Sequence, residues 1–193
     1  MPNWCNNTLT LEHEDPAMIA RAKAAFLDGR LLDEFIPVPK DLHIVAGSVG
    51  AKDSPEQIAL EAQEKANLEA HGYATWYDYC VNEWGTKWDV GGDDGTYNDI
   101  EGGIIVSFDS AWAPPIEAYR KLEDLGFEIK AYYFEGGMMF AGIYKDGDDD
   151  YYELEGMTAS DAVDILPEDL NELFGISSSI EEYDAEENEE DTE

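Results

Sequence analysis

The sequence predicts an α+β fold: a ferredoxin-like split βαβ antiparallel sheet with a helical insertion, an extra β-hairpin and a disordered acidic C-terminal tail. Three observations predict it. Apolar and polar residues alternate in several short segments, as in half-buried strands, while in others apolar residues recur every three or four positions, as in helices. These segments follow in the order β, α, insertion, β, β, α, β, β, β, which is the split βαβ pattern with added strands.

The first βα unit is marked by both signals. Residues 6–12 alternate, with Leu9 and Leu11 on one face of a predicted strand. Asp15 and Pro16 are the residue types of a helix N-cap and first turn, and Gly29 ends the helical pattern. We therefore expect a strand and then a helix before residue 30.

A helical insertion is expected at about residues 54–85. Ser54 and Pro55 predict the start of a helix that Gly72 ends. In the second helix, apolar and aromatic residues from Tyr73 to Trp84 fall on one stripe, which must be buried against another element.

Strand patterns return in the second half of the chain. Alternation indicates strands at residues 103–109, 127–133, 138–144 and 151–154, and a helix is expected between the first two, after the prolines at 114 and 115. Two short helices should close the body, which we expect to be one domain over residues 1–176. The last thirteen residues hold nine acids and no base, so residues 177–193 are predicted to be a disordered tail.

The charge is extreme for a chain that folds. The 193 residues carry 45 acids against 11 bases, a net charge of −34, yet 44% of the residues are hydrophobic. Removing the nine acids of the tail still leaves a large negative charge on the body. Dispersed bases cannot build a basic patch against this field, so direct binding to nucleic acid is not expected. No apolar run is long enough for a membrane span, so we expect no membrane contact and a protein of the cytoplasm of the cell that makes it. We also expect no cofactor.

Three aromatic and amide-rich segments form the most distinctive motif: residues 2–7 (PNWCNN), 82–89 (NEWGTKWD) and 108–115 (FDSAWAPP). Together they resemble the YubB-like family of bacteriophages and conjugative plasmids. The resemblance implies a ferredoxin-like domain and a mobile-element origin, and it implies no established activity. The residues of interest are Asn3, Trp4, Asn82, Trp84, Lys87, Trp88, Asp89 and Trp112.

This motif cluster has two interpretations. Its large flat rings and hydrogen-bonding groups can line a pocket, or they can specify the fold, because buried Trp and Tyr need partners for their polar atoms.

The second candidate surface is acidic. Carboxylates can occupy a protein site built for the phosphate charges of DNA, with Glu and Asp in place of phosphate oxygens. The candidate partner-binding residues are Glu56, Glu61, Glu64, Glu69, Asp93, Asp94, Asp99, Glu101, Asp146, Asp148, Asp149 and Asp150. The alternative is that the acids are a solvated coat or an adaptation to salt.

Catalytic and metal-binding patterns are weak. The acids from Asp146 onward resemble the start of a calcium loop, but Tyr151 and Met157 stand where such a loop needs Gly and Glu. His71 and Cys80 are a conceivable thiol dyad, although Cys80 lies within the aromatic stripe, as a buried apolar residue would. We predict no catalytic residue and no metal ligand.

The sequence favours a non-enzymatic protein that binds and inhibits a basic host protein, one that handles nucleic acid or serves in defence, by mimicking nucleic acid. One alternative is a small-ligand or metal-assisted enzyme built on the aromatic motifs. A third is an acidic accessory protein with no inhibitory role.

Overall fold

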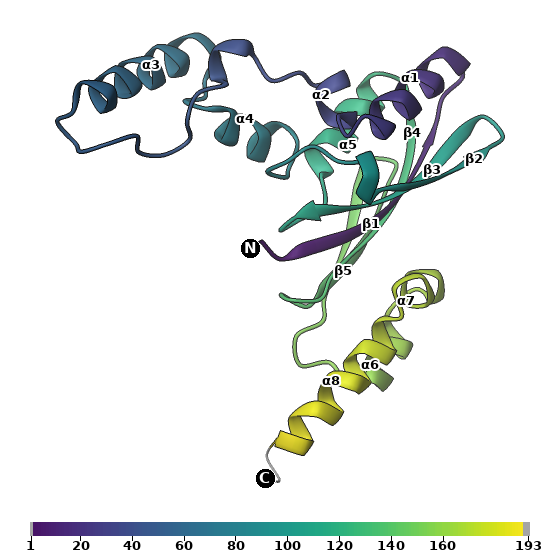
Figure 1. Ribbon diagram of the computed structural model, residues 1–193. Coiled ribbons are helices and arrows are strands. Elements are labelled where there is room, and N and C mark those ends of the chain that lie inside the picture. Colours follow the sequence, from purple (N-terminus) through teal and green to yellow (C-terminus); the bar gives the residue numbers. More distant parts are fainter. Residues whose placement is uncertain (1, 191–193) are drawn as a thin grey trace.

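Six antiparallel strands form a sheet in the computed structural model, which describes residues 2–190 and the side chains of residues 2–183 (Figure 1). They are β1 (Trp4–Glu12), β2 (Thr96–Ile100), β3 (Gly103–Ala111), β4 (Glu128–Glu135), β5 (Phe140–Lys145) and β6 (Asp148–Glu153). Their order across the sheet is β2-β3-β1-β4-β5-β6. The predicted α+β class with an antiparallel sheet is confirmed.

Four neighbouring strands, β2, β3, β1 and β4, have the split βαβ arrangement. Strand β1 pairs with β3 on one side and with β4 on the other, so β3 separates β1 from β2. The helices α1 (Pro16–Leu27) and α5 (Ile116–Asp124) connect the strands as predicted, and the hairpin of β5 and β6 extends the sheet beyond β4.

The main core lies between the sheet and these two helices (Figure 1). Alternation in β1 places Leu9 and Leu11 there, where both are fully buried. From the helices, Phe26 of α1 and Tyr119 of α5 are also buried. Gly91 packs against the end of α1, since a Cβ atom there would lie 2.2 Å from the Phe26 carbonyl oxygen.

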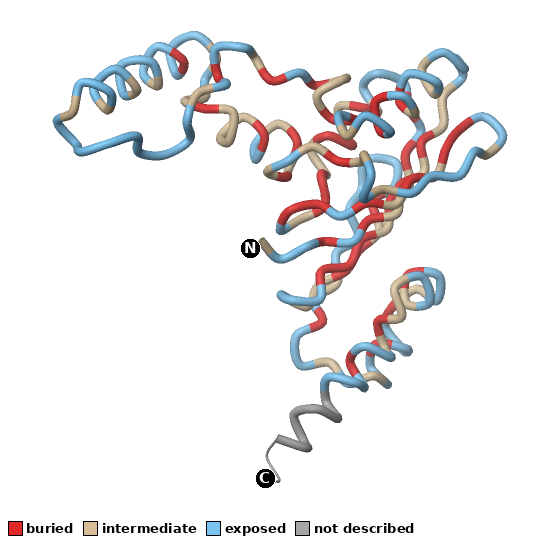
Figure 2. The backbone as a smooth tube through the Cα atoms, in the orientation of Figure 1, coloured by how far each residue is buried: buried red, intermediate tan, exposed pale blue. Residues whose placement is uncertain are grey.

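The insertion between α1 and β2 is longer than the predicted 54–85. It contains α2 (Leu31–Phe35), the 3₁₀ turns η1 (Lys40–Leu42) and η2 (Gly92–Asp94), and the expected helices α3 (Pro55–His71) and α4 (Trp76–Glu83). Helix α3 projects away from the sheet and is exposed along almost its whole length (Figure 2). Its one buried residue is Asn67, whose Nδ2 atom donates to the carbonyl oxygens of Asp41 and Ala74, both at 2.9 Å.

Three further helices form a second, smaller core. They are α6 (Ala159–Ile165), α7 (Glu168–Phe174) and α8 (Ile176–Glu190), and they pack on Phe134 and Ala141 of the sheet face opposite α1.

The prediction of a disordered tail from residue 177 is wrong at its beginning. Helix α8 starts at Ile176, and Ile180, one turn later, is buried. Ile176 and Ile180 lie one helical turn apart and pack α8 against the second core. The other residues of α8 are mostly acidic or polar, so its sequence shows no clear helical pattern. Residues 191–193 lie outside the described residues.

Candidate functional site

The three motif segments meet at one end of the sheet. Trp4 begins β1 and pairs in register with Ala111, the last residue of β3, while the backbone N–H of Trp112 donates to the Asn3 carbonyl oxygen at 2.9 Å. Trp88 follows α4 in the chain, and its ring centroid lies 5.9 Å from that of Trp4. Strand register therefore brings Trp4 and Trp112 together, and the segment after α4 places Trp88 beside them.

The backbone of Trp112 is in the left-handed region, with φ of 69°. A bulky residue in that region costs on the order of 1–3 kcal/mol, which the surrounding structure has to offset. The hydrogen bond to Asn3 and the edge-on contact with Tyr77, at 6.4 Å between ring centroids, hold it there. The side chain of Trp112 is 41% exposed.

The ammonium group of Lys87 lies among three of these rings. Its Nζ atom is 4.4 Å from the Trp88 centroid, 5.4 Å from that of Trp112 and 5.7 Å from that of Tyr77. A cation within about 6 Å of an aromatic face is attracted by the negative charge above the ring. We call Trp4, Tyr77, Trp88, Trp112 and this ammonium group the aromatic surface.

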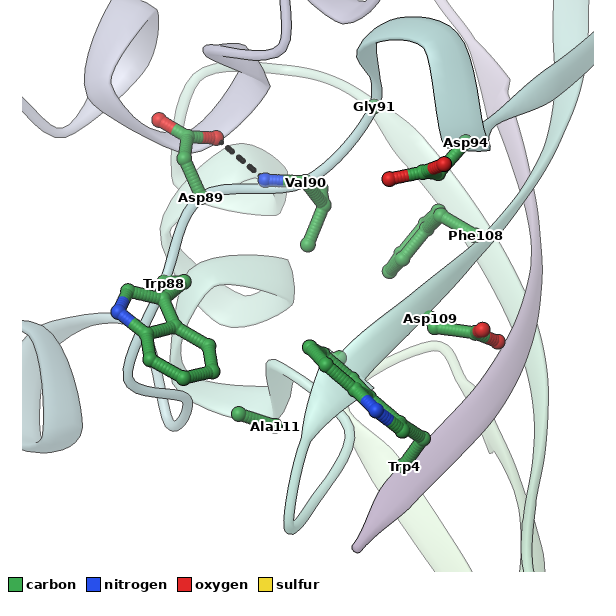
Figure 3. Close-up of a pocket in the computed structure, with 10 residues that line it drawn as sticks. Trp4, Trp88, Asp89, Val90, Gly91, Asp94, Phe108, Asp109 and Ala111 are labelled. Atoms are coloured by element: carbon green, nitrogen blue, oxygen red, sulfur yellow. Dashed lines mark hydrogen bonds between the residues drawn. The ribbon is translucent and has the colours of Figure 1, made fainter. Parts of the chain in front are cut away.

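Two hollows flank the aromatic surface, each of about 460 Å³. The first lies between Trp4 and Trp88, with Val90 and Phe108 as its apolar lining and Asp94 and Asp109 as its acidic lining (Figure 3). The second lies between α3 and α4. Among the residues that line it are Glu64, Tyr77, Lys87 and Trp112.

Other members of the motif cluster are structural. Trp84 is buried, and its indole N–H donates to the Ile36 carbonyl oxygen at 2.9 Å. Asn82 is exposed and donates to the carbonyl oxygen of Asp78, one turn earlier in the same helix. Asn3 contributes the backbone acceptor for Trp112. Of the motif cluster, Trp4, Trp88 and Asp89 line the first hollow and Lys87 and Trp112 line the second, while Trp84 and Asn82 make hydrogen bonds within the fold.

Asp89 lines the first hollow but turns its carboxylate inward. Its oxygens accept hydrogen bonds from the backbone N–H groups of Leu32 at 2.7 Å, Asp33 at 2.8 Å and Val90 at 2.8 Å. Burial raises the pKa of this carboxyl, and the three backbone hydrogen bonds oppose that rise. Asp89 thus satisfies the free N–H groups at the start of α2 and anchors the segment that carries Trp88.

The predicted acidic residues are not gathered on one face. At 100° per residue, the four acids of α3 (Glu56, Glu61, Glu64 and Glu69) spread over about 220° of the helix circumference. Asp93 and Asp94 lie in η2, while Glu101 lies in the hairpin turn between β2 and β3. Only Glu64 and Asp94 of the predicted acids line the two hollows.

The remaining predicted acids lie elsewhere, some with partners of their own. Asp99 of β2 forms an ion pair with Lys23 at 2.7 Å. Asp149 accepts a hydrogen bond from the Tyr133 hydroxyl at 2.7 Å. Asp148 and Asp150 lie with it on the edge strand β6, and Asp146 lies in the turn before that strand. The candidate acids therefore lie on several separate elements, and those of the β2–β3 and β5–β6 hairpins lie at opposite edges of the sheet.

The buried thiols are poorly suited to nucleophilic chemistry. Burial raises the pKa of Cys80 to about 12, with the nearby Asp89 and Asp33 adding to the effect. The ring of His71 contacts Asp41, at 3.4 Å. Among the side chains of residues 2–183, no group of three or more His, Cys, Asp or Glu is placed to hold a metal ion. The described helices also include none that is long and apolar enough to cross a membrane.

Comparisons with known proteins add little. No protein-family model and no curated protein matches the chain. A crystal structure of the protein api92 from Yersinia pseudotuberculosis, of the family model DUF1281, is similar at 15% identity, with a TM-score of 0.40. The match covers 79% of this chain and 98% of that chain. A similarity this distant carries no information about what either protein binds, and nothing in it indicates an enzymatic activity.

Sequence reasoning missed several residues of the site. Tyr77 belonged to the apolar stripe of α4, but its position beside Lys87 and Trp112 depends on how α4 meets the end of β3. Phe108 and Asp109 are in one of the quoted motifs, and alternation along β3 places Phe108 toward the core and Asp109 outward. The alternation of β3 was therefore a sequence signal that Asp109 is exposed at the motif.

Proposed function

We propose that this is a non-enzymatic acidic protein that binds and inhibits a basic, nucleic-acid-binding host protein by presenting carboxylates in place of phosphates. The observation that carries the proposal is the outward charge of the folded body. Among the side chains of residues 2–183, seven of the eleven basic residues form ion pairs with acids of the same chain. They are Arg21, Lys23, Arg30, Arg120, Lys121, Lys130 and Lys145. Little positive charge is left to offset the exposed carboxylates.

The aromatic surface supports the same proposal. Single-stranded nucleic acid presents flat rings beside negative phosphates, and proteins that bind it combine a basic groove with stacking side chains. Here, exposed indole rings lie beside Asp94 and Asp109 in one hollow and beside Glu64 in the other. Rings and carboxylates in this arrangement resemble what such a partner recognises.

Competition with nucleic acid tests the proposal. The immobilised protein should capture nucleic-acid-binding proteins from a bacterial lysate at low salt, and single-stranded DNA should displace them. Binding should weaken steeply with salt, as expected when carboxylates replace phosphates. If the captured proteins bind no nucleic acid, or if excess DNA fails to displace them, mimicry is wrong.

A matched pair of variants separates recognition from a general charge effect. One variant changes Asp94 and Asp109 to Asn, and the other changes Glu56 and Glu69, on the exposed helix α3, to Gln. Both variants lose two charges. We expect the first to weaken capture by about tenfold and the second by less than threefold, because charges near the contact contribute most. Equal effects would favour the view that the acids are a solvated coat.

A small-ligand protein remains the second candidate. The hollow between Trp4 and Trp88, at about 460 Å³, is within the size range of small-molecule sites. Two results together would favour this alternative. A neutral metabolite would bind in the hollow and raise the melting temperature, and DNA would not displace the proteins captured from the lysate.

A further inference from the structure

We propose that the hollow between Trp4 and Trp88 is a receptor for a cationic side chain, an arginine, donated by the partner protein. This inference rests on the proposed function in one respect: the arginine comes from the basic partner protein proposed there. Trp4 and Trp88 are 46% and 38% exposed, so both rings are available to a ligand. Val90 and Phe108 are almost completely buried and form the apolar part of the lining.

The two indole rings lie at the distance of an aromatic pair, with centroids 5.9 Å apart, so a ligand must stack on an outer face and not between them. Their planes are inclined by 35°, and the hollow extends from them toward Asp94 (Figure 3). A planar guanidinium group can stack on an indole face and still donate hydrogen bonds from its edge. The open hollow therefore has the shape for a side chain that is flat at its tip and apolar along its stem.

Carboxylates supply the matching charge. Asp94 and Asp109 line the hollow and are exposed. The Oδ1 atom of Asp109 accepts a hydrogen bond from Asn6 of β1 at 2.6 Å, which directs this carboxylate toward β1, so Asp94 is the carboxylate that points into the hollow (Figure 3). Asp89 is not available, because its oxygens accept backbone hydrogen bonds. A guanidinium on the rings would thus meet a charged acceptor at its edge.

The protein already places one cation on the same group of rings. Lys87 is at 4.4 Å from the Trp88 centroid and also lies near Trp112 and Tyr77. The Lys87 ammonium already uses the Trp88 ring and would repel a second cation placed close to it. Trp4 is the ring of the aromatic surface that lies outside the Lys87 contacts.

Charge also decides against the other occupants of an aromatic hollow. A nucleic-acid base would bring its phosphates into the field of a chain with a net charge of −34. A second copy of the chain would bring the same charge. A neutral sugar would use the rings but gain nothing from the surrounding carboxylates. An arginine of a basic protein gains from both.

The site is held in place before any ligand arrives. Trp4 is fixed by the pairing of β1 with β3, and the segment of Trp88 by the Asp89 hydrogen bonds to α2. A binding site that needs little ordering loses less entropy when it binds.

Short peptides test the receptor directly. The probes are acetyl-tetra-arginine amide and the same peptide with citrulline, which keeps the shape and removes the charge. The indole N–H signals in a two-dimensional NMR spectrum report each tryptophan separately. We expect the arginine peptide to shift the Trp4 and Trp88 signals with saturation, and the citrulline peptide to shift neither. Trp4→Ala and Trp88→Ala should each weaken binding by about tenfold.

Two controls keep the test decisive. The variant Tyr151→Ala removes an exposed ring beside the acids of β6. Tyr151 lines neither of the two hollows, so this variant should bind the arginine peptide as the unaltered protein does. If an alanine variant fails to fold, Trp4→Phe and Trp88→Phe keep a ring and should bind with intermediate affinity.

The inference is overturned if the citrulline peptide binds equally well, if a neutral sugar binds in place of arginine, or if the tryptophan variants bind arginine normally. Normal binding by the variants together with DNA-displaced capture would leave the proposed function intact and remove only this receptor. The reverse result, a specific arginine site with no captured nucleic-acid-binding protein, would contradict the proposed function instead.

Discussion

The aromatic surface and helix α3 are both exposed and both lie among acids, but they are held in different ways. The aromatic surface is fixed from several directions, by strand pairing at Trp4, by a strained backbone at Trp112 and by the hydrogen bonds of Asp89 behind Trp88. Helix α3 projects into solvent, and its one buried residue is Asn67. Its acids point in many directions. Charge arranged around a fixed shape can be recognised, whereas charge spread around a helix mainly increases hydration.

The largest expected effect comes from removing the support behind Trp88. Asp89→Ala leaves the backbone N–H groups of Leu32, Asp33 and Val90 without their acceptor. We expect the free energy of unfolding to fall by about 3 kcal/mol, as for a buried charged hydrogen-bonding group. Chemical denaturation measures it, with the exposed Asp93→Ala as a control that should change stability by less than about 0.5 kcal/mol. Equal losses would mean that Asp89 does not hold the aromatic surface in place.

A smaller and local effect is expected at α3. Asn67→Ala removes the two hydrogen bonds that join the helix to the Asp41 and Ala74 carbonyl groups. We expect a loss of about 1–2 kcal/mol. Amide hydrogen exchange should become faster in α3 and stay unchanged in β1 and β3, because regions with few buried contacts open independently. Faster exchange across the sheet as well would show that α3 and the aromatic surface form one cooperative unit.

The smallest effect is expected at the connection between α3 and α4, where Tyr73 precedes α4 and contacts Glu83 at its end. The hydrogen bond from the Tyr73 hydroxyl to Glu83 is the main cause that raises the pKa of Tyr73 to about 12. The folded-state pKa lies above that of an unfolded tyrosine, near 10, so this contribution is complete below pH 10 and is lost as the pH rises through 12.

Tyr73→Phe should therefore be slightly less stable than the unaltered protein at pH 8, and the difference should shrink between pH 10 and 12. Thermal denaturation across this range measures it. A difference that does not change with pH would mean that the hydroxyl makes no net contribution through Glu83.

Local signals predicted much of the fold. Asp15 with Pro16 and Ser54 with Pro55 mark the starts of α1 and α3, because side-chain caps and proline act on neighbouring backbone groups. Alternation located β1, β3, β4 and β5 to within about two residues at most ends. The start of α8 was missed, because Ile176 and Ile180 are too few to produce a visible period among polar residues.

The sequence by itself determined the α+β class, most of the helices and strands, and the excess of negative charge, since these depend on the identity and spacing of nearby residues. The tertiary structure alone decided which acids lie beside the tryptophans, and that Asp89 faces the backbone of α2 while Asp94 faces the hollow. The physical reason is distance along the chain. Trp4, Trp88 and Trp112 meet only after strand register and helix packing are set, and no local pattern encodes the separation of side chains that far apart in sequence.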